Sequence, residues 1–297
     1  MNKLGVGLLG TRGLVGKTYK KLLKDHPFFE LIFAPKREEL RNIEKAKGCV
    51  LIFSALPNEA AEIYDPLYAN AGFTVFSSAS YRRLQENVPL IIPEINGTKL
   101  KGWKGMIIAK PNCTLQSMLL PLYPLHQKFG LKQVSVTNLQ SISGAGSNFT
   151  LRDNVIPFIE GEEEKSEKES LKILENPLIE ISVHCTRVPV LHGHLACVSA
   201  SFKETPTLEQ VRDCWDSFKG LNLPSSPEKV FIYFDEVDRP QPELDVNVGN
   251  GMAIALGRLR TCSLFDIRFT SLSHNLIRGA AGGGLLAAEL YAKENLL

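Results

Sequence analysis

The sequence predicts an α/β protein in which a parallel sheet is followed by an α+β region with a mostly antiparallel sheet. In the first half, short apolar runs alternate with amphipathic stretches, which is typical of parallel strands joined by helices. From about residue 131, longer strand-like runs show partial alternation of apolar and polar residues. Such alternation is typical of an antiparallel sheet with one polar-tolerant face.

The first half is predicted to hold five strands and at least two covering helices. The predicted strands are the apolar, partly β-branched runs 4–9, 30–34, 50–54, 73–76 and 106–109. The amphipathic stretches 14–24 and 58–71 lie between strands and are predicted to be helices.

The second half is predicted to be richer in long strands. They are 132–142, 179–190, 194–203, 251–261 and 264–272, with helices at about 162–174 and 207–218. The Ala/Leu-rich tail 275–293 is predicted to be a helix. Its glycines lower helix propensity, so we expect close packing against another element.

Length and composition exclude several classes of protein. A chain of 297 residues with 44% hydrophobic and 22% charged residues is long enough for two domains and is not disordered as a whole. A net charge of +2 argues against a dedicated nucleic-acid binder. No apolar run approaches the roughly 18 residues of a membrane helix, and the N-terminal segment is predicted to be a strand rather than a signal peptide. The six cysteines form no C-x-x-C pair, so we expect no metal site, no disulfide framework and a cytoplasmic location.

A glycine-rich turn directly follows the first predicted strand. Gly10 and Gly13 stand between the strand 4–9 and the next helix. Glycines allow backbone N–H groups to approach a diphosphate, and the helix N-terminus favours its negative charge. This context predicts a Rossmann-type dinucleotide-binding domain. The alternative is a tight turn of some other α/β protein.

The residues after the second predicted strand indicate which dinucleotide is bound. Lys36 and Arg37 stand where a carboxylate would favour the ribose hydroxyl of NAD. Basic side chains suit a 2′-phosphate, so they favour NADP. The alternative is that both are ordinary surface charges.

Cys113 is the cysteine with the most unusual surroundings. It lies in a polar loop, after Asn112, between a predicted strand and a helix that begins at 115. A helix N-terminus favours the thiolate form of a cysteine. The sequence therefore makes Cys113 a candidate nucleophile, whereas a lone cysteine is more often a small buried hydrophobic residue.

Residues 187–194 end one predicted strand and begin the next. Either His192 or His194 could serve as a base for a thiol, and Arg187 could hold a carboxylate. Gln140 lies near the end of the predicted strand 132–142 and could donate to a substrate group.

Taken together, these residues resemble aspartate-semialdehyde dehydrogenase, in the archaeal and fungal-like branch of that family. The resemblance runs through nearly the whole chain. It is carried by the glycine turn and by residues 53–57, 88–94, 111–114, 143–146, 154–159, 161–165, 187–190, 193–194, 238–242 and 272–283.

The resemblance implies a role for each candidate. Cys113 would be the nucleophile, His194 rather than His192 the acid/base residue, and Gln140 would position the acyl intermediate. The implied substrate-binding residues are Arg187 and Glu162 for the carboxylate and amino group, and Lys165, Asn112 and Arg83 for phosphate. The implied cofactor-binding residues are Gly10, Thr11, Arg12, Gly13, Leu14 and Val15 for the diphosphate, Lys36 and Arg37 near the 2′-phosphate, and Ser143, Gly144 and Asn275 beside the nicotinamide.

The implied activity is the reversible, NADPH-dependent reduction of L-aspartyl 4-phosphate to aspartate semialdehyde through a cysteine thioester. This reaction belongs to lysine/diaminopimelate, threonine and methionine biosynthesis. The implied domains are an NADP-binding domain of 1–130 plus 275–297 and a catalytic and dimerisation domain of 131–274, in a homodimer or homotetramer.

The chain departs from the family pattern at a few positions. Arg12 replaces a small polar residue, Ser78 and Lys110 replace asparagines, and the chain is compressed after Arg37 and between 146 and 153. The alternative functions are N-acetylglutamyl-phosphate reductase, malonyl-CoA reductase, or a non-catalytic protein that retained the fold.

Overall fold

The structure is a computed structural model that describes residues 3–103 and 106–296, and its contacts divide the chain into two units. Unit 1 is Met1–Pro111 with Leu223–Ser225 and Ala280–Leu297, and unit 2 is Asn112–Asn222 with Ser226–Gly279. The domain bounds expected from the sequence stay a prediction. Within the described ranges, no helix is both long and apolar enough to cross a membrane.

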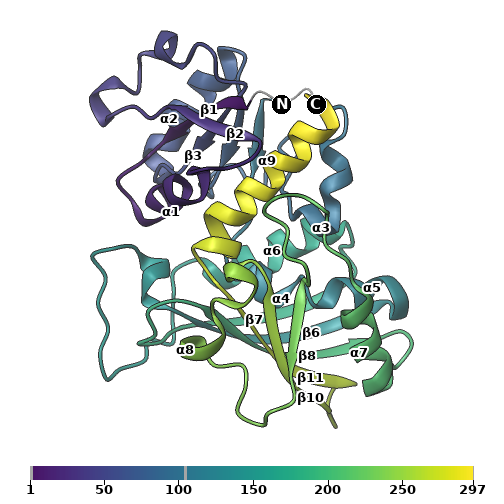
Figure 1. The fold of residues 1–297 in the computed structure, drawn as a ribbon. Coiled ribbons are helices and arrows are strands. Elements are labelled where there is room, and N and C mark those ends of the chain that lie inside the picture. The colour runs from purple at the N-terminus through teal and green to yellow at the C-terminus, as the bar shows by residue number, and fades with distance from the viewer. Residues whose placement is uncertain (1–2, 104–105, 297) are drawn as a thin grey trace. The chain divides into compact units, whose positions relative to one another are not determined.

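Unit 1 is built on a parallel sheet with the strand order β2-β1-β3-β4-β5. Figure 1 labels β1, β2 and β3 of this sheet. The strands are β1 (Leu4–Leu9), β2 (Phe29–Phe33), β3 (Leu51–Ser54), β4 (Thr74–Ser77) and β5 (Ile107–Ala109). Each arises from one of the five apolar runs, because parallel strands are buried on both faces and therefore need apolar side chains on both. This confirms the first part of the predicted fold class.

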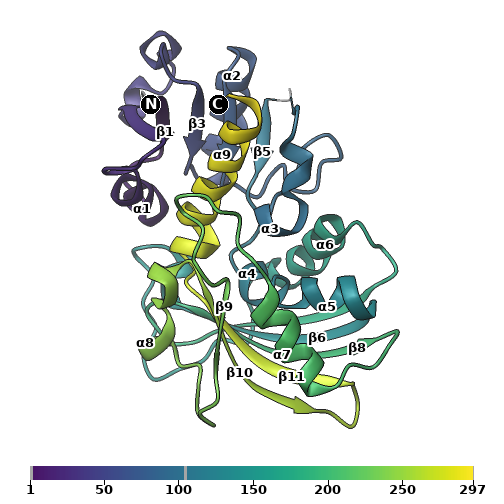
Figure 2. The ribbon, with the colours of Figure 1, turned by 45° about the vertical axis from the view of Figure 1, so that its right-hand side comes forward.

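The helices of unit 1 include three that lie between strands and one from the C-terminus. They are α1 (Leu14–Leu23), α2 (Asn58–Asn70), the short α3 (Pro93–Asn96) and α9 (Gly282–Asn295). In Figure 2, α9 lies between α1 and α3, and both contact it. Leu285 and Ala288 of α9 join Val6 and Leu8 of β1 in one buried cluster. The C-terminal helix therefore contributes to the core of the unit that begins the chain.

The glycines of the tail have a packing function, as expected. A Cβ at Gly284 would overlap the hydroxyl of Tyr19, which is fully buried on α1. The tail begins with one π-helical turn, Ile277–Ala281, before α9.

Unit 2 is built on a six-stranded sheet with the order β7-β6-β8-β11-β10-β9. Its strands are β6 (Leu131–Gln140), β7 (Glu180–Arg187), β8 (His194–Phe202), β9 (Phe231–Phe234), β10 (Ile254–Thr261) and β11 (Ile267–Ser273). The three inner pairs are antiparallel, and the outer pairs β6–β7 and β9–β10 are parallel. The predicted mostly antiparallel sheet is confirmed, although β9 was absent from the prediction.

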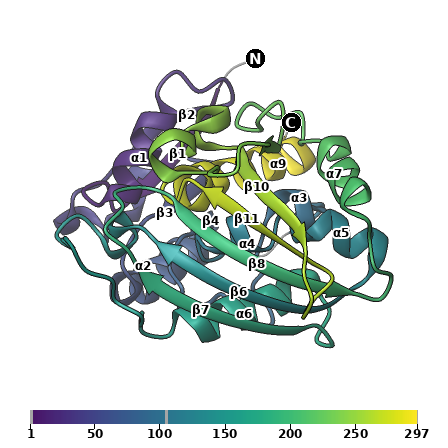
Figure 3. The same cartoon turned by 90° about the horizontal axis from the view of Figure 1, so that it is seen from below.

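The two faces of this sheet have different environments. Helices α4 (Leu115–Met118), α5 (Leu122–Phe129), α6 (Glu162–Leu174) and α7 (Leu208–Ser217) contact its strands. The opposite face, toward the viewer in Figure 3, carries partly exposed small polar side chains such as Ser135, Thr137, Ser199 and Thr270. The helix-covered face and the strand ends carry the buried polar residues considered next.

Candidate active site

Cys113 lies in a turn of unit 2 that its own neighbours help to shape. The side-chain oxygen of Asn112 accepts hydrogen bonds from the backbone N–H and the hydroxyl of Thr114, both at 3.0 Å. Helix α4, which follows, is only four residues long. Its dipole is correspondingly small, so the helix-terminus argument for a thiolate is weaker than the sequence indicated. Close packing also defines the turn, because a Cβ at Gly279 would lie 2.7 Å from the Cβ of Cys113.

His194 is the histidine that contacts the sulfur. Its Nε2 lies 3.1 Å from Cys113 Sγ, and the residue is fully buried at the start of β8. The backbone N–H of Ser141 donates to Nδ1 at 3.1 Å. A peptide N–H can only donate, so we assign the ring proton of the neutral imidazole to Nε2. In this tautomer Nε2–H donates to the sulfur and stabilises a thiolate.

His192 occupies a different place. Its Nδ1 lies 3.0 Å from the hydroxyl of Ser143, and its ring stacks on His274 with centroids 5.3 Å apart. Partial burial lowers the pKa of His192, which favours the neutral ring. Of the two histidines that the residues alone left open, the structure thus brings His194 to the candidate nucleophile.

Three candidates stand in one row across the sheet. Gln140 at the end of β6 is the register partner of Arg187 on β7 and of His194 on β8. Directly paired residues of neighbouring strands lie on the same face, so the three side chains share one side. All three are buried, with exposed fractions of 2% for Gln140, 6% for Arg187 and 0% for His194.

Arg187 is held by the backbone near this row. One of its terminal nitrogens donates to the carbonyl of Ser141 at 2.7 Å. Burial lowers the pKa of Arg187, and the nearby Cys113 and Glu162 oppose that change. The guanidinium carries further N–H groups beyond this bond, so it retains the capacity to bind a carboxylate.

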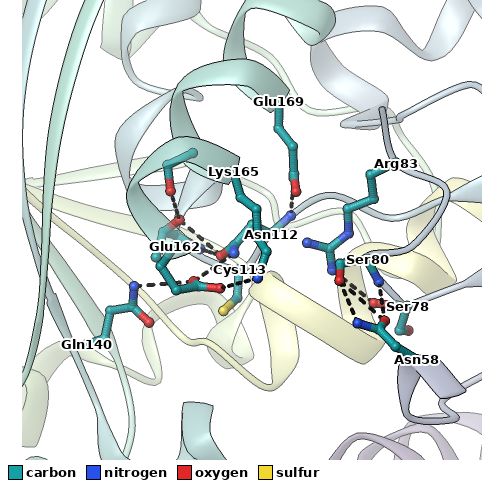
Figure 4. Close-up of polar contacts among 12 residues, drawn as sticks. Asn58, Ser78, Ser80, Arg83, Asn112, Cys113, Gln140, Glu162, Lys165 and Glu169 are labelled. Atoms are coloured by element: carbon teal, nitrogen blue, oxygen red, sulfur yellow. Dashed lines mark hydrogen bonds and ion pairs between the residues drawn. The ribbon is translucent and has the colours of Figure 1, made fainter. Parts of the chain in front are cut away.

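Glu162, at the start of α6, gathers several candidate substrate-binding residues. Its Oε2 accepts from the side-chain amides of Asn112 at 2.7 Å and Gln140 at 3.4 Å (Figure 4). Its Oε1 lies 3.7 Å from the ammonium of Lys165, one turn along the helix. The structure therefore brings the acidic and basic residues of this predicted pair together beside Cys113's turn.

Ser143, Gly144 and Asn275 also lie together. The amide of Asn275 accepts from Gly193 N–H at 3.0 Å and donates to the hydroxyl of Ser143 at 2.9 Å. A Cβ at Gly144 would lie 2.9 Å from Arg187 and 3.1 Å from His194. Only glycine fits there without displacing one of these side chains.

In unit 1, the glycine turn has the geometry of an anion-binding loop. Gly10 has φ +83°, and a Cβ there would lie 2.5 Å from the carbonyl of Ala55. Around Gly13 nothing lies within 4 Å of an added Cβ, so this position is open. Helix α1 begins after Gly13 with neither a side-chain cap nor an acidic residue in its first turn. Its first N–H groups can therefore receive a diphosphate. Thr11 and Arg12 complete the turn, and Leu14 and Val15 begin the helix.

Lys36 and Arg37 are both exposed after β2. The carboxylate of Glu39 turns back to accept from the backbone N–H of Lys36 at 3.2 Å and pairs with Lys45 at 2.7 Å. The hydrogen bond from Lys45 is the main reason that the pKa of Glu39 is lowered. This carboxylate is thereby occupied, which leaves the two cations as the exposed charges that begin the loop.

Arg83 belongs to unit 1, where it donates to the carbonyl of Ser78 at 2.9 Å. Figure 4 shows it beside Ser78 and Ser80. Ser80 in turn bonds to Asn58 at the start of α2, with N–H to Oδ1 at 2.8 Å. Arg83 is thus buried and oriented by its own unit.

A parallel sheet with an anion-binding turn, together with a cysteine–histidine pair on a second sheet, is typical of dehydrogenases that hold their substrate covalently. The family model "Semialdehyde dehydrogenase, NAD binding domain" matches residues 5–103, and "Semialdehyde dehydrogenase, dimerisation domain" matches residues 122–278. The chain belongs to the semialdehyde dehydrogenase family.

Several relatives span nearly the whole chain. It is 39% identical to an aspartate-semialdehyde dehydrogenase of Archaeoglobus fulgidus, over 99% of this chain and 100% of the relative. It is 35% identical to the Schizosaccharomyces pombe enzyme of the same name, over 98% and 99%, and 33% identical to a malonyl CoA reductase (NADP) of Metallosphaera sedula, over 99% and 98%. The first of these alignments runs over 343 positions, so at least 46 of them face gaps in this chain of 297 residues.

Solved structures agree with these relatives. Aspartate semialdehyde dehydrogenase with NADP from Candida albicans is 30% identical, with a TM-score of 0.88 and coverage of 99% of both chains. Aspartate semialdehyde dehydrogenase II of Vibrio cholerae, 23% identical with a TM-score of 0.87, shows the same fold over the full length of both chains. The resemblance inferred from the sequence is thereby confirmed.

Sequence reasoning missed several residues that shape the site. They are Ser141, which acts through its backbone, Gly279, and the helix residues Ser166 and Glu169. Gly279 lies in the 272–283 stretch that carries the resemblance, where its place after His274 is the available signal, but a backbone N–H leaves no trace in a sequence.

Proposed function

We propose that this protein is an aspartate-semialdehyde dehydrogenase that reduces L-aspartyl 4-phosphate to aspartate semialdehyde with NADPH. The observation that carries the proposal is the 3.1 Å contact between Cys113 Sγ and His194 Nε2. Relatives that carry this name support it at 33–39% identity over nearly the full chain.

The chemistry begins with the thiolate of Cys113. It attacks the acyl carbon of the acyl phosphate, a C–S bond forms, the C–O bond to phosphate breaks, and inorganic phosphate leaves. A thioester is needed because a carboxylate is too electron-rich to accept hydride. When bound, NADPH supplies the hydride that reduces the thioester. The C–S bond then breaks, and the aldehyde and the Cys113 thiolate are released. One proton is taken up overall, because the departing phosphate is released as hydrogen phosphate, whereas Cys113 starts and ends the sequence as a thiolate.

His194 is the proposed acid/base residue for the thiol. With the ring proton on Nε2, it stabilises the thiolate as a hydrogen-bond donor, both before attack and when sulfur leaves. To accept the thiol's proton it must adopt the other tautomer, which gives up the bond from Ser141 N–H. The resting arrangement therefore favours a cysteine that is already deprotonated.

The substrate-binding roles are proposed as the resemblance implies them. Arg187 is proposed to bind the α-carboxylate, Glu162 the amino group, and Lys165, Asn112 and Arg83 the phosphate. Gln140, whose side chain bonds both Glu162 and Cys185, is proposed to position the acyl group. A carboxylate and a cation three residues apart on α6 suit a substrate that carries both charges.

The residues of unit 1 fit NADP. The open position at Gly13 and the uncapped start of α1 can receive the diphosphate, with Gly10, Thr11, Arg12, Leu14 and Val15 around it. Lys36 and Arg37 would contact the 2′-phosphate. In unit 2, Ser143, Gly144 and Asn275 are proposed to line the nicotinamide side.

The proposal extends to assembly and location. A dimerisation-domain match covers residues 122–278, and the partly exposed polar face of the unit 2 sheet is the proposed contact in a homodimer or homotetramer. Sedimentation velocity of the purified protein tests this, and a monomer at micromolar concentration contradicts it. We further propose a cytoplasmic location and a place in lysine, threonine and methionine biosynthesis.

The deciding experiment is phosphate-dependent reduction of NADP⁺ with aspartate semialdehyde. We expect turnover that requires phosphate and is lost in Cys113→Ala. Because one relative is named malonyl CoA reductase, the matched second assay uses malonyl-CoA and NADPH as substrates. Oxidation of NADPH by malonyl-CoA, with none of the phosphate-dependent reaction, would replace the proposed substrate. Turnover with N-acetylglutamyl phosphate alone would do the same.

A further inference from the structure

Three side chains of α6 contact the turn that carries Cys113. Glu162, Ser166 and Glu169 are spaced four and three residues apart, so they lie on one face of the helix. Glu162 accepts from the Asn112 side chain at 2.7 Å, and the hydroxyl of Ser166 lies 3.2 Å from that of Thr114. Glu169 accepts from the backbone N–H of Asn112 at 2.7 Å.

The Glu169 contact differs from the other two in its target and its burial. It is made to the main chain of the residue directly before Cys113, and Figure 4 shows the carboxylate directed at that nitrogen. Only 1% of Glu169 is exposed. A buried carboxylate is costly unless hydrogen bonds satisfy it, and a bond from N–H to a charged oxygen is shorter and stronger than a neutral one.

The turn needs such support because its own local structure is slight. The Asn112–Thr114 bonds span two residues, and α4 is a single turn. Yet Cys113 must meet His194, which comes from a strand 81 residues further along the chain. A contact from α6, 57 residues from Asn112, is well placed to determine where the sulfur lies.

We propose that Glu169 is a positioning residue for the reaction: its carboxylate fixes the Asn112 peptide and thereby directs Cys113 Sγ toward His194 Nε2. The proposal rests on the proposed function only for the identity of the substrate that the Cys113 thiolate attacks. The contact itself is a property of the resting protein.

The same helix provides a matched control. Glu167 lies two residues earlier and also accepts a backbone N–H, from Val183 of the edge strand β7 at 3.1 Å. It makes the same kind of bond from the same helix, to a part of the sheet that does not carry the nucleophile. Glu167 is partly exposed, so its loss should cost less stability than the loss of the buried Glu169, and the alkylation rate of Cys113 rather than the melting temperature tests positioning.

The test compares Glu169→Ala, Glu169→Asp and Glu169→Gln with Glu167→Ala. Four quantities are measured: kcat, KM, melting temperature, and the rate at which iodoacetamide alkylates Cys113, followed by peptide mass spectrometry. We expect Glu169→Ala and Glu169→Asp to lower kcat and alkylation rate by up to about 100-fold, the scale of a 1 Å misplacement, with KM little changed. The side chain in Glu169→Asp is one methylene too short to reach Asn112 N–H. Glu169→Gln keeps an acceptor oxygen at the right distance and should retain most of kcat and of the alkylation rate.

Glu167→Ala should lower the melting temperature and leave the alkylation rate of Cys113 at the wild-type value. A wild-type alkylation rate and kcat in Glu169→Asp would overturn the proposal. Equal losses of alkylation rate in Glu169→Asp and Glu167→Ala would overturn it as well. If Glu169→Ala does not fold, Glu169→Gln and Glu169→Asp still distinguish a positioning role from a merely structural one. Alkylation needs no substrate, so a slower reaction in Glu169→Asp supports positioning even if aspartate semialdehyde proves not to be the substrate.

Discussion

The peptide N–H of Ser141 determines which ring nitrogen of His194 carries its proton, and this one bond distinguishes His194 from His192. His192 instead bonds to a hydroxyl, which can donate or accept, so its tautomer is not fixed in the same way. A ring with Nε2–H toward sulfur is suited to a cysteine that starts and ends each cycle as a thiolate.

Replacing the nucleophile should separate binding from chemistry. We expect Cys113→Ser to abolish turnover while NADP still binds, because a serine hydroxyl is a far poorer nucleophile and its alkoxide a far poorer leaving group. Steady-state assays and a fluorescence titration with NADPH measure the two effects. Turnover well above background in this variant would remove the thioester from the mechanism.

The two histidines should differ strongly in their effect. His194→Asn should lower kcat by about 10²–10⁴-fold, the usual scale for a residue that handles protons at a reacting centre. His192→Asn should have a mild effect, because its ring contacts Ser143 and His274. If side-by-side kinetics showed a larger loss of kcat in His192→Asn than in His194→Asn, the acid/base role would belong to His192.

Cofactor preference should depend on Arg37. A 2′-phosphate carries up to two negative charges, whereas NAD has a neutral hydroxyl there. We expect NADP to be preferred, and Arg37→Glu to shift the ratio of kcat/KM toward NAD. Glu38, exposed in the same loop, is the residue that could instead reach the ribose. A wild-type ratio near one that the substitution leaves unchanged would mean that Lys36 and Arg37 are only surface charges.

At the scale of elements, glycines allow helices to approach one another and the strands. Gly284 lets α9 meet Tyr19 of α1, and Gly16 lets α1 pack on the carbonyl of Gly10. The turn of unit 1 and the C-terminal helix are both held by such contacts. This explains why a helix tolerates glycines that lower its intrinsic propensity.

Gly284→Ala should therefore destabilise the protein. Its methyl group overlaps a buried hydroxyl, and overpacking of this kind costs about 1–3 kcal/mol. Gly13→Ala is the control for stability, because its Cβ would meet nothing within 4 Å and its φ of −71° suits alanine. Urea unfolding measures both. An unchanged free energy of unfolding in Gly284→Ala would show that α9 can shift to make room.

The elements themselves were largely predictable, and the contacts between distant ones were not. Helix α6 matches its predicted span, because most of its residues are Glu, Lys and Leu, which favour helix. Strand β9 was missed because it is four residues long and pairs only at the sheet edge. The role of Glu169 was hidden within a charged run that is typical of a solvated surface, and only the fold shows that its side chain is buried.

At the scale of the whole molecule, the chain returns twice to the unit in which it begins. Leu223–Ser225 and Ala280–Leu297 both belong to unit 1. Glu289 of α9 joins them: it accepts from His26 at 2.8 Å and from the backbone N–H and hydroxyl of Ser225. The ring of His26 in turn accepts from Phe28 and Phe29 N–H, so its proton lies toward Glu289.

Removing this carboxylate should loosen all three segments together. We expect Glu289→Ala to cost at least about 1–3 kcal/mol, the penalty for a buried donor left unsatisfied, and to expose the Leu223–Ser225 segment to proteolysis. Glu294→Ala, on the same helix but exposed, should be neutral. Limited trypsin digestion measures this through cleavage at Lys219 and Lys229, on either side of the segment. Equal resistance of the two variants would contradict this anchoring.

The row of Arg187, Gln140 and His194 also limits how the length of the chain can vary. Side chains alternate along a strand, so inserting or deleting one residue in β6 would turn Gln140 to the opposite face and separate it from both neighbours. A loop such as 146–153 carries no such constraint. The 46 or more positions absent relative to the Archaeoglobus fulgidus protein are therefore expected in loops. For anyone redesigning this enzyme, its loops are open to further trimming, whereas β6, β7 and β8 permit exchange of residues but no change in their number.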